Sequence, residues 1–117
     1  MVDALAKNGA NEAPSYQAVT GGALGFRSVN SSGNLLASDA NKIVRATAGA
    51  GGITLTLPDP TTVVGTPIYV KKVDSDVGVV TIAQFAGETI DGSATVGLAS
   101  QWQLLGIVSD GTNWILL

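Results

Sequence analysis

The chain has 117 residues, a length typical of a single domain. Hydrophobic residues make up 45% of the sequence and charged residues only 13%, about half the usual share. Its mean hydropathy of +0.34 is high for a protein whose surface faces only water. Because association hides apolar surface, we expect copies of the chain to form a homo-oligomer.

The charge and residue counts exclude several classes of function. The net charge is −3, and the six basic residues are spread thinly, so no clustered basic face is available for nucleic acid. The chain has neither histidine nor cysteine, which removes the usual general base, the commonest metal ligand and any disulfide. No apolar run approaches the roughly 18 residues of a membrane helix. We therefore expect no enzyme, no cofactor, no nucleic-acid partner, no membrane partner and no signal peptide.

Residues 1–32 differ in composition from the rest. This segment is rich in Ala, Gly, Asn and Ser and has weak apolar periodicity, so we predict an extended N-terminal arm. Two interpretations remain open: a tail without fixed structure, or an arm that orders on a neighbouring subunit. The second is favoured by scattered anchor residues, which we predict to contact a neighbouring subunit: Tyr16, Val19, Leu24, Phe26 and Arg27.

Residues 33–117 have the pattern of a β-domain. Ile53, Leu55 and Leu57 alternate with threonines, as in a half-buried strand, and the following prolines end that strand. Similar runs recur every 8–12 residues or so, which predicts about eight short strands. We therefore predict an all-β fold, a compact antiparallel sandwich or barrel that is jelly-roll-like or β-tulip-like. The other strand-like runs are 42–46, 67–73, 79–83, 95–98, 102–108 and 114–117.

The last two runs form a predicted hairpin. Asp110 and Gly111 mark a tight turn, and Asn113 adds a side chain that bonds locally to the backbone. The run 102–108 is apolar on both strand faces, so it needs two covers, and the second could be another subunit. The residues predicted for core and trimer contacts are Trp102, Leu105, Ile107 and Trp114. The alternative for the two tryptophans is stacking on sugar rings.

Isolated carboxylates do not form a convincing reactive site. Asp74 and Asp76 could donate oxygens to Ca²⁺, but the spacing of a calcium loop is missing, and a hairpin turn is favoured. Glu88 and Asp91 lie three residues apart and are better explained as flanking a turn than as an acid/base pair. We therefore predict neither a metal site nor a catalytic site.

Three segments resemble a β-module of bacteriophage virion proteins. They are ANKIVRATAGAGGITLTLPDP (40–60), PIYVKKVDSDVGVVTIAQFAGETIDG (67–92) and LLGIVSDGTNWILL (104–117). The pieces TIDG and SDGTNW are the most specific. The module is similar to those of capsid decoration (cement) proteins and of head or tail fibres.

The resemblance implies a structural virion protein without enzymatic activity. It implies a homotrimer that is made in the host cytoplasm and binds the phage major capsid protein on the outer surface of the head. One compact β-domain with a preceding arm suits a decoration protein, because fibre proteins are usually long. The alternative is a short head or tail fibre, or a receptor-binding module that recognises host surface glycans.

Overall fold

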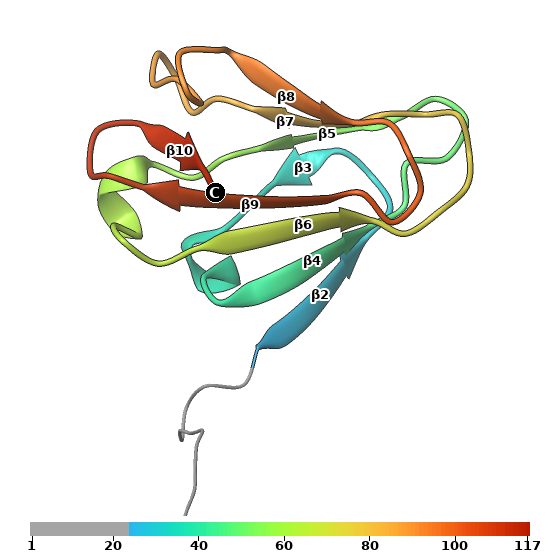
Figure 1. Ribbon diagram of the computed structural model, residues 1–117, viewed down its shortest axis with the longest axis horizontal. Coiled ribbons are helices and arrows are strands. Elements are labelled where there is room, and N and C mark those ends of the chain that lie inside the picture. Colours follow the sequence, from blue (N-terminus) through green and yellow to red (C-terminus); the bar gives the residue numbers. More distant parts are fainter. Residues whose placement is uncertain (1–23) are drawn as a thin grey trace, which may run out of the picture.

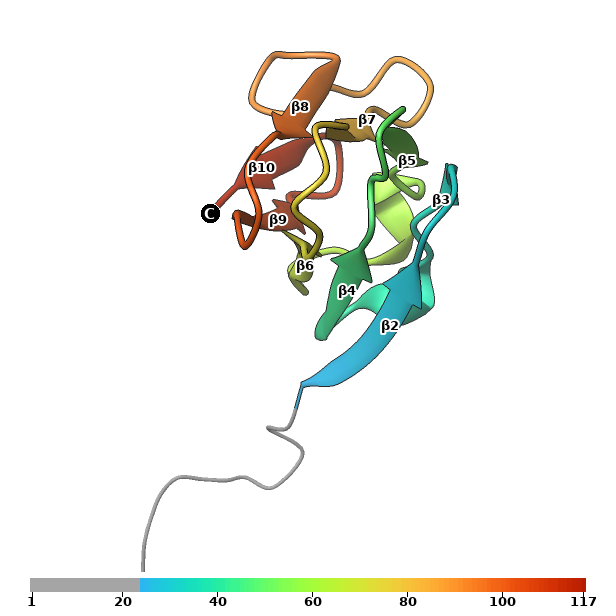
Figure 2. The ribbon, with the colours of Figure 1, turned by 90° about the vertical axis from the view of Figure 1, so that its right-hand side faces the viewer.

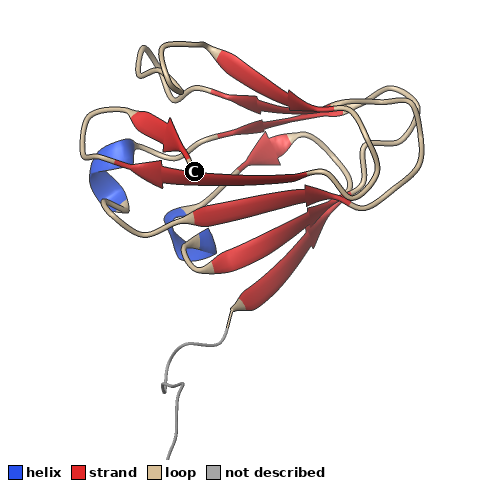
Figure 3. Cartoon of the chain, viewed as in Figure 1, coloured by secondary structure: helices blue, strands red, loops and turns tan. Residues whose placement is uncertain are grey.

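The computed structural model describes residues 24–117, which form a mostly β structure of nine short strands in two mixed sheets packed as a sandwich (Figure 1). Figure 2 shows the two sheets end-on, and Figure 3 shows that strands and loops dominate. The five-stranded sheet has the order β10-β9-β6-β4-β2 and the four-stranded sheet the order β3-β5-β7-β8. The all-β sandwich predicted from the sequence is confirmed at this level.

The strands are short, and two single turns of 3-10 helix join them at one end. The five-stranded sheet contains β2 (Gly25–Val29), β4 (Lys42–Ala46), β6 (Ile68–Lys72), β9 (Leu104–Ser109) and β10 (Trp114–Leu116). The four-stranded sheet contains β3 (Gly33–Asn34), β5 (Ile53–Thr56), β7 (Val80–Ala83) and β8 (Thr95–Leu98). The 3-10 turns are η1 (Ala37–Asp39) and η2 (Pro60–Thr62).

The strand directions differ from the predicted antiparallel arrangement. In the five-stranded sheet β2, β4 and β6 run parallel, and in the other sheet β3, β5 and β7 run parallel. This follows from the path of the chain, which crosses to the opposite sheet after each of these strands and so returns in the same direction. Among the described strands, only the pairs β7–β8, β6–β9 and β9–β10 are antiparallel. The first six strands therefore wind as three coils, which the last three strands complete.

The hydrophobic core fills the space between the two sheets. Alternation along β5 places Ile53 and Leu55 inside and exposes Thr54, as the period-2 pattern predicts. Trp114 from β10 is fully buried in this core. Other fully buried hydrophobic residues include Ile90 from the loop between β7 and β8 and, from the two sheets, Val44, Ile68, Val70, Val80, Ile82 and Ile107.

The sandwich begins before the predicted boundary at residue 32. Strand β2 pairs with β4 along its whole length, from Gly25 opposite Lys42 to Val29 opposite Ala46. Residues 25–29 are therefore an edge strand of the domain and not part of an arm. The sequence did not reveal this strand because its GFRSV segment has only two clearly apolar side chains.

Strand β9 is shorter than predicted, and Trp102 lies outside it. Gln103 accepts hydrogen bonds from the N–H groups of Ala99 and Ser100 through its side-chain oxygen, and its own N–H donates to the Ser100 carbonyl. This tight turn holds Trp102 at a φ of 70° with its side chain 58% exposed. Trp102 is thus a surface residue of the described chain and not part of its core, and a trimer contact at Trp102 stays a prediction.

Candidate interaction surface

The most distinctive surface is the outer side of the five-stranded sheet. Strand register aligns Phe26, Ile43, Tyr69 and Gly106 in one row across four strands. The Leu117 N–H donates to the Gly106 carbonyl, which extends this row past β10. We call this surface the apolar face and define it by Phe26, Ile43, Tyr69, Leu104, Val108, Ile115 and Leu117. The side chains of Phe26, Leu104 and Leu117 are 64%, 52% and 71% exposed.

A glycine flattens the centre of the apolar face. A Cβ added at Gly106 would lie 3.1 Å from Tyr69 Cε1 and 3.2 Å from Leu117 Cδ1. The missing side chain therefore lets Tyr69 and Leu117 lie over β9. The result is a continuous apolar surface across the sheet, of the kind that marks contact sites in proteins.

The cations near the apolar face lie at one end of it. Arg45 and Lys71 align with Leu104 in the next row across the sheet. No strand of the five-stranded sheet contains an aspartate or glutamate. The described strands of the face thus offer apolar contact with two cations at one end, and the Asp91 carboxylate lies at the β10 edge, where it accepts the Leu116 N–H.

The outer side of the four-stranded sheet has the opposite character. Register aligns Thr54 with Thr81, and Thr56 with Ala83 and Thr95. These hydroxyl-bearing side chains give an uncharged polar surface. The two outer surfaces of the sandwich therefore differ: one can be covered by apolar contact, and the other suits exposure to water.

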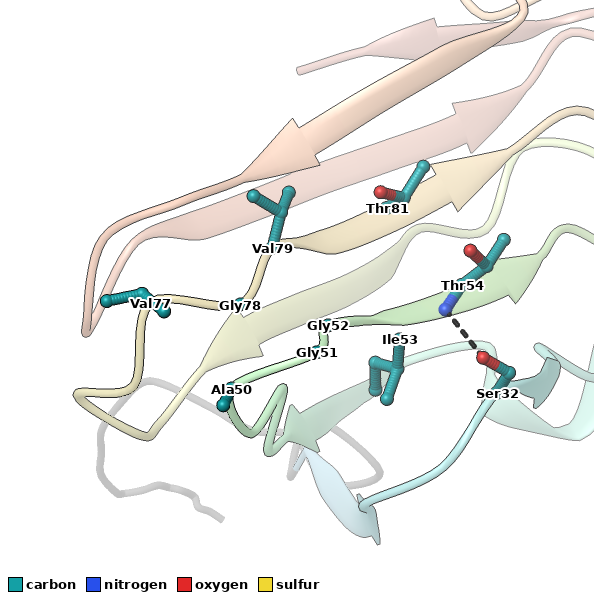
Figure 4. Close-up of a pocket in the computed structure, with 10 residues that line it drawn as sticks. All are labelled: Ser32, Ala50, Gly51, Gly52, Ile53, Thr54, Val77, Gly78, Val79 and Thr81. Carbon is teal, nitrogen blue, oxygen red and sulfur yellow. Dashed lines mark hydrogen bonds between the residues drawn. The ribbon is translucent and has the colours of Figure 1, made fainter.

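An open depression of about 370 Å³ lies beside the threonines, where two loops meet the four-stranded sheet (Figure 4). Its floor is largely backbone, from glycines at 51, 52 and 78, and the exposed Val77 stands at its rim. Ser32 Oγ accepts a hydrogen bond from the Thr54 N–H at 2.9 Å across one side. The residues that line the depression include neither a charged nor an aromatic side chain, so they provide no stacking platform.

A buried lysine ties the loops at the end of β6. Lys72 Nζ is fully buried and donates to the Asp74 carboxylate at 3.0 Å and to the carbonyls of Asp74 and Asp76, each at 2.8 Å. The Asp74 carboxylate also accepts the N–H groups of Ala48 and Gly49. The pKa of Asp74 is lowered to about 2, chiefly by the hydrogen bond from the Ala48 N–H and also by Lys72 and Gly49. Burial raises this pKa, but by less than the hydrogen bonds lower it.

This arrangement engages both residues that sequence analysis considered as calcium ligands. Asp74 is engaged by an ammonium group and two amides, and Asp76 contributes its carbonyl to the same ammonium. The cluster is a structural clamp between the β4–β5 and β6–β7 loops. Sequence analysis missed Lys72, although its place two residues after Val70 on an inward-facing alternation was a usable signal.

Arg27 has a similar structural role at the other margin. Its guanidinium donates two hydrogen bonds of 2.8 Å to the buried Asp39 carboxylate, which also accepts the Leu36 N–H. Burial opposes ionisation of Asp39, but the bonds from Arg27 and Leu36 outweigh it and lower the pKa of this carboxyl. Arg27 therefore fixes β2 against η1 instead of projecting from a free arm.

The predicted site residues lie in separate places. Leu24 and Phe26 are exposed at the β2 margin, whereas Tyr16 and Val19 lie outside the described residues. The side chains of Leu105, Ile107 and Trp114 point inward and are buried in the core of one subunit. Sequence analysis did not single out three apolar residues that the sheet exposes on its outer side: Leu104, Ile115 and Leu117.

The predicted turn residues lie between β9 and β10. The Asp110 carboxylate accepts the N–H groups of Thr112 and Asn113, and Gly111 has a φ of 98°, which glycine adopts readily. The Asn113 side-chain oxygen accepts the Thr89 N–H, which fastens the turn to the segment before Ile90. The residues therefore hold the hairpin and do not form a binding site.

The described part of the chain holds no group of three or more His, Cys, Asp or Glu side chains placed to bind a metal ion. Among residues 24–117, no helix has the length and apolar character needed to cross a bilayer. Comparisons with protein-family models and with curated proteins found no match to this chain.

Proposed function

We propose that this chain is a structural protein of a bacteriophage particle, a decoration protein that binds the outer surface of the head at junctions between capsid subunits. The observation that carries the proposal is the apolar face, a contact surface on a small sandwich. The resemblance of the three segments to phage virion modules supports the same role. The proposed protein acts by contact, without catalysis or cofactor, and its site of action is the virion after synthesis in the host cytoplasm.

The proposed mechanism is mechanical. A homotrimer over a junction makes contacts with several major capsid protein subunits at once, and linked contacts hold more firmly than each one alone. Leu24 and Phe26 are exposed where the chain enters β2, so they are available to a capsid subunit. Arg27 supports them indirectly, because its ion pair with Asp39 fixes β2. Tyr16 and Val19 are proposed to add contacts from the preceding segment.

The test compares phage particles with and without this protein. Both preparations are exposed to heat, chelator and osmotic shock, and released DNA and adsorption to the host are measured separately. A decoration protein predicts early DNA release from particles that lack it, with normal adsorption. Unchanged head stability together with reduced adsorption would refute the decoration role.

The second candidate is a short fibre or receptor-binding module that recognises host surface glycans. It is favoured by Trp102, a residue that is 58% exposed and lies in the turn before β9. Exposed aromatic rings stack on sugars, whereas the buried Trp114 cannot. Under this alternative, Trp102→Ala lowers adsorption and leaves the particles intact. Under the decoration role, the same variant adsorbs normally.

A further inference from the structure

The two sheets have four edges, which differ in how well they are closed. A sheet edge carries unpaired backbone N–H and C=O groups and attracts another strand unless something covers it. The edge at β10 is closed, because the Trp114 N–H donates to the Thr89 carbonyl and the Asp91 N–H donates to the Trp114 carbonyl. The edge at β3 contains only two residues. Among residues 24–117, the longer edges at β2 and β8 are paired on one side only.

Strand β2 forms the lower margin of the five-stranded sheet in Figure 1 and leaves alternate backbone groups facing outward. The Gly25 N–H donates to the residue before β4, and the Val29 carbonyl accepts from the residue after it. In this parallel pair, the odd-numbered residues of β2 therefore bond to β4. The N–H and C=O groups of Phe26 and Ser28 point away from β4 and have no backbone partner within the described chain.

The features that usually protect a sheet edge are missing from β2. Proteins guard such an edge with a proline, a bulge, a charged side chain or a very short strand. The register between β2 and β4 is continuous over five residues, and the GFRSV segment contains no proline. Its one charged side chain, Arg27, is engaged by the buried Asp39 carboxylate. An unguarded edge of this length suits the addition of a strand from another molecule.

We propose that an extended segment of the major capsid protein adds as a further strand along β2. The inference rests on the proposed function, whose capsid contact it places on a sheet edge. The outward N–H and C=O groups of Phe26 and Ser28 supply the main-chain hydrogen bonds. Side chains at alternate positions of the added segment supply the specificity.

The side chains beside β2 define the chemistry of the added segment. Phe26 is 64% exposed at the margin of the apolar face, so an apolar side chain of the partner covers it. Ser28 and the exposed Arg45 share the next row, and no carboxylate among residues 24–117 is ion-paired with Arg45. An added strand lies two strand spacings from β4, about 10 Å, which an arginine and an acidic side chain can span together. The segment therefore carries an apolar residue and, two positions along, an acidic one.

The edge at β8 offers less to a partner than the edge at β2. Its outer-face residues are Thr95 and Gly97, which align with Ala83 and Thr81 of β7. None of these has a large apolar side chain that an added strand could cover. Strand β8 is therefore the natural control for experiments on β2.

A proline at residue 28 tests the strand addition. Ser28→Pro removes an outward N–H and breaks no bond to β4, whereas Ser28→Ala keeps the N–H and loses only the hydroxyl. In sedimentation of the full-length protein with empty capsids, Ser28→Pro should bind roughly tenfold more weakly than wild type, and Ser28→Ala should bind normally. Thr95→Pro removes an outward N–H at the β8 edge and should also bind normally. Equal binding of the two Ser28 variants would overturn the inference.

Amide hydrogen exchange tests the same contact without any substitution. In the free protein, the amides of Arg27 and Val29 bond to β4 and should exchange more slowly than those of Phe26 and Ser28. On capsids, the Phe26 and Ser28 amides should become protected as well. If these two amides were already protected in the free protein, another part of the chain or a second copy would occupy the edge, and the inference would be wrong.

The acidic residue of the partner is tested by charge reversal. Arg45→Glu should weaken capsid binding roughly fivefold at low salt and less at high salt. Lys71→Glu changes the charge equally, but it lies one strand further from the edge and should weaken binding less. Equal effects of the two variants would refute the pairing with Arg45. Capsid binding that leaves the Phe26 and Ser28 amides unprotected refutes the strand addition alone, whereas no capsid binding refutes the decoration role together with it.

Discussion

Replacing Trp114 by alanine tests how much of the fold depends on one side chain from the last strand. Trp114 is 0% exposed, and its backbone bonds to Thr89 and Asp91 on the segment beside it. Truncation leaves a cavity between the sheets that the strands on either side cannot fill. We expect a loss of about 3–5 kcal/mol in the free energy of unfolding, out of the roughly 5–15 kcal/mol available to a small domain.

A phenylalanine at the same position should be much less damaging. The indole Nε1 of Trp114 is buried and has no hydrogen-bond partner among residues 24–117, and such a group costs about 1–3 kcal/mol. Trp114→Phe removes that cost and leaves a smaller cavity, so we expect less than half of the loss seen with alanine. Urea unfolding followed by circular dichroism, at one fixed protein concentration, measures both. An alanine variant within about 1 kcal/mol of wild type, or equal losses for the two variants, would refute the reasoning.

The remaining predictions concern charge, close packing and chain length. The pKa of Asp74 is lowered to about 2, so its contribution to stability is present above pH ~4, where unfolded carboxyls ionise, and is lost as the pH falls toward 2. Thermal melts of wild type and Asp74→Asn across that pH range measure this contribution. An equal change of melting temperature with pH in the two proteins would contradict the stabilising role of the Asp74 carboxylate. Gly78→Ala should severely weaken folding, because an added Cβ would overlap the backbone of the adjoining loop. Gly87→Ala, with nothing within 4 Å of its added Cβ, should leave the urea midpoint unchanged. Equal urea midpoints for the Gly78 and Gly87 variants would show that the loop holding Gly78 can move away from its neighbour. Deleting residues 1–23 should leave a folded sandwich, whereas deleting 1–30 removes β2 and should lower the melting temperature; equal melting temperatures would show that this strand is dispensable.

The positions of most strands could be predicted from the sequence, but their directions could not. Alternation such as Ile53, Leu55 and Leu57 reports which side chains face the core, and it is the same whether the neighbouring strand runs parallel or antiparallel. Direction depends on where the chain goes between strands. The connection from β4 to β6 passes through β5 in the opposite sheet, and no local pattern encodes that crossing.

The surface was harder to predict than the core. Trp102 and Trp114 both stand beside apolar runs in the sequence. Trp102 lies in the turn made by Gln103 and is exposed, whereas Trp114 lies on β10 and is buried. The apolar face was equally hidden, because its rows join residues from five strands that are distant in sequence. Arg27 was read as an anchor for a partner, and its pairing with Asp39 becomes visible only once β2 lies beside η1.

The coiled path of the chain has a consequence for how the protein reaches its native state. Each parallel pair joins segments that are far apart along the chain, such as Gly25 with Lys42 and Ile53 with Val80. Closing such loops costs entropy before any contact repays it, which makes parallel pairing slow. The β9–β10 hairpin closes over only a few residues and can form within microseconds. We expect the hairpin to form before the parallel strands have paired. Its exposed leucines and isoleucine then meet other chains at the stage when unfinished sheets are most prone to aggregate.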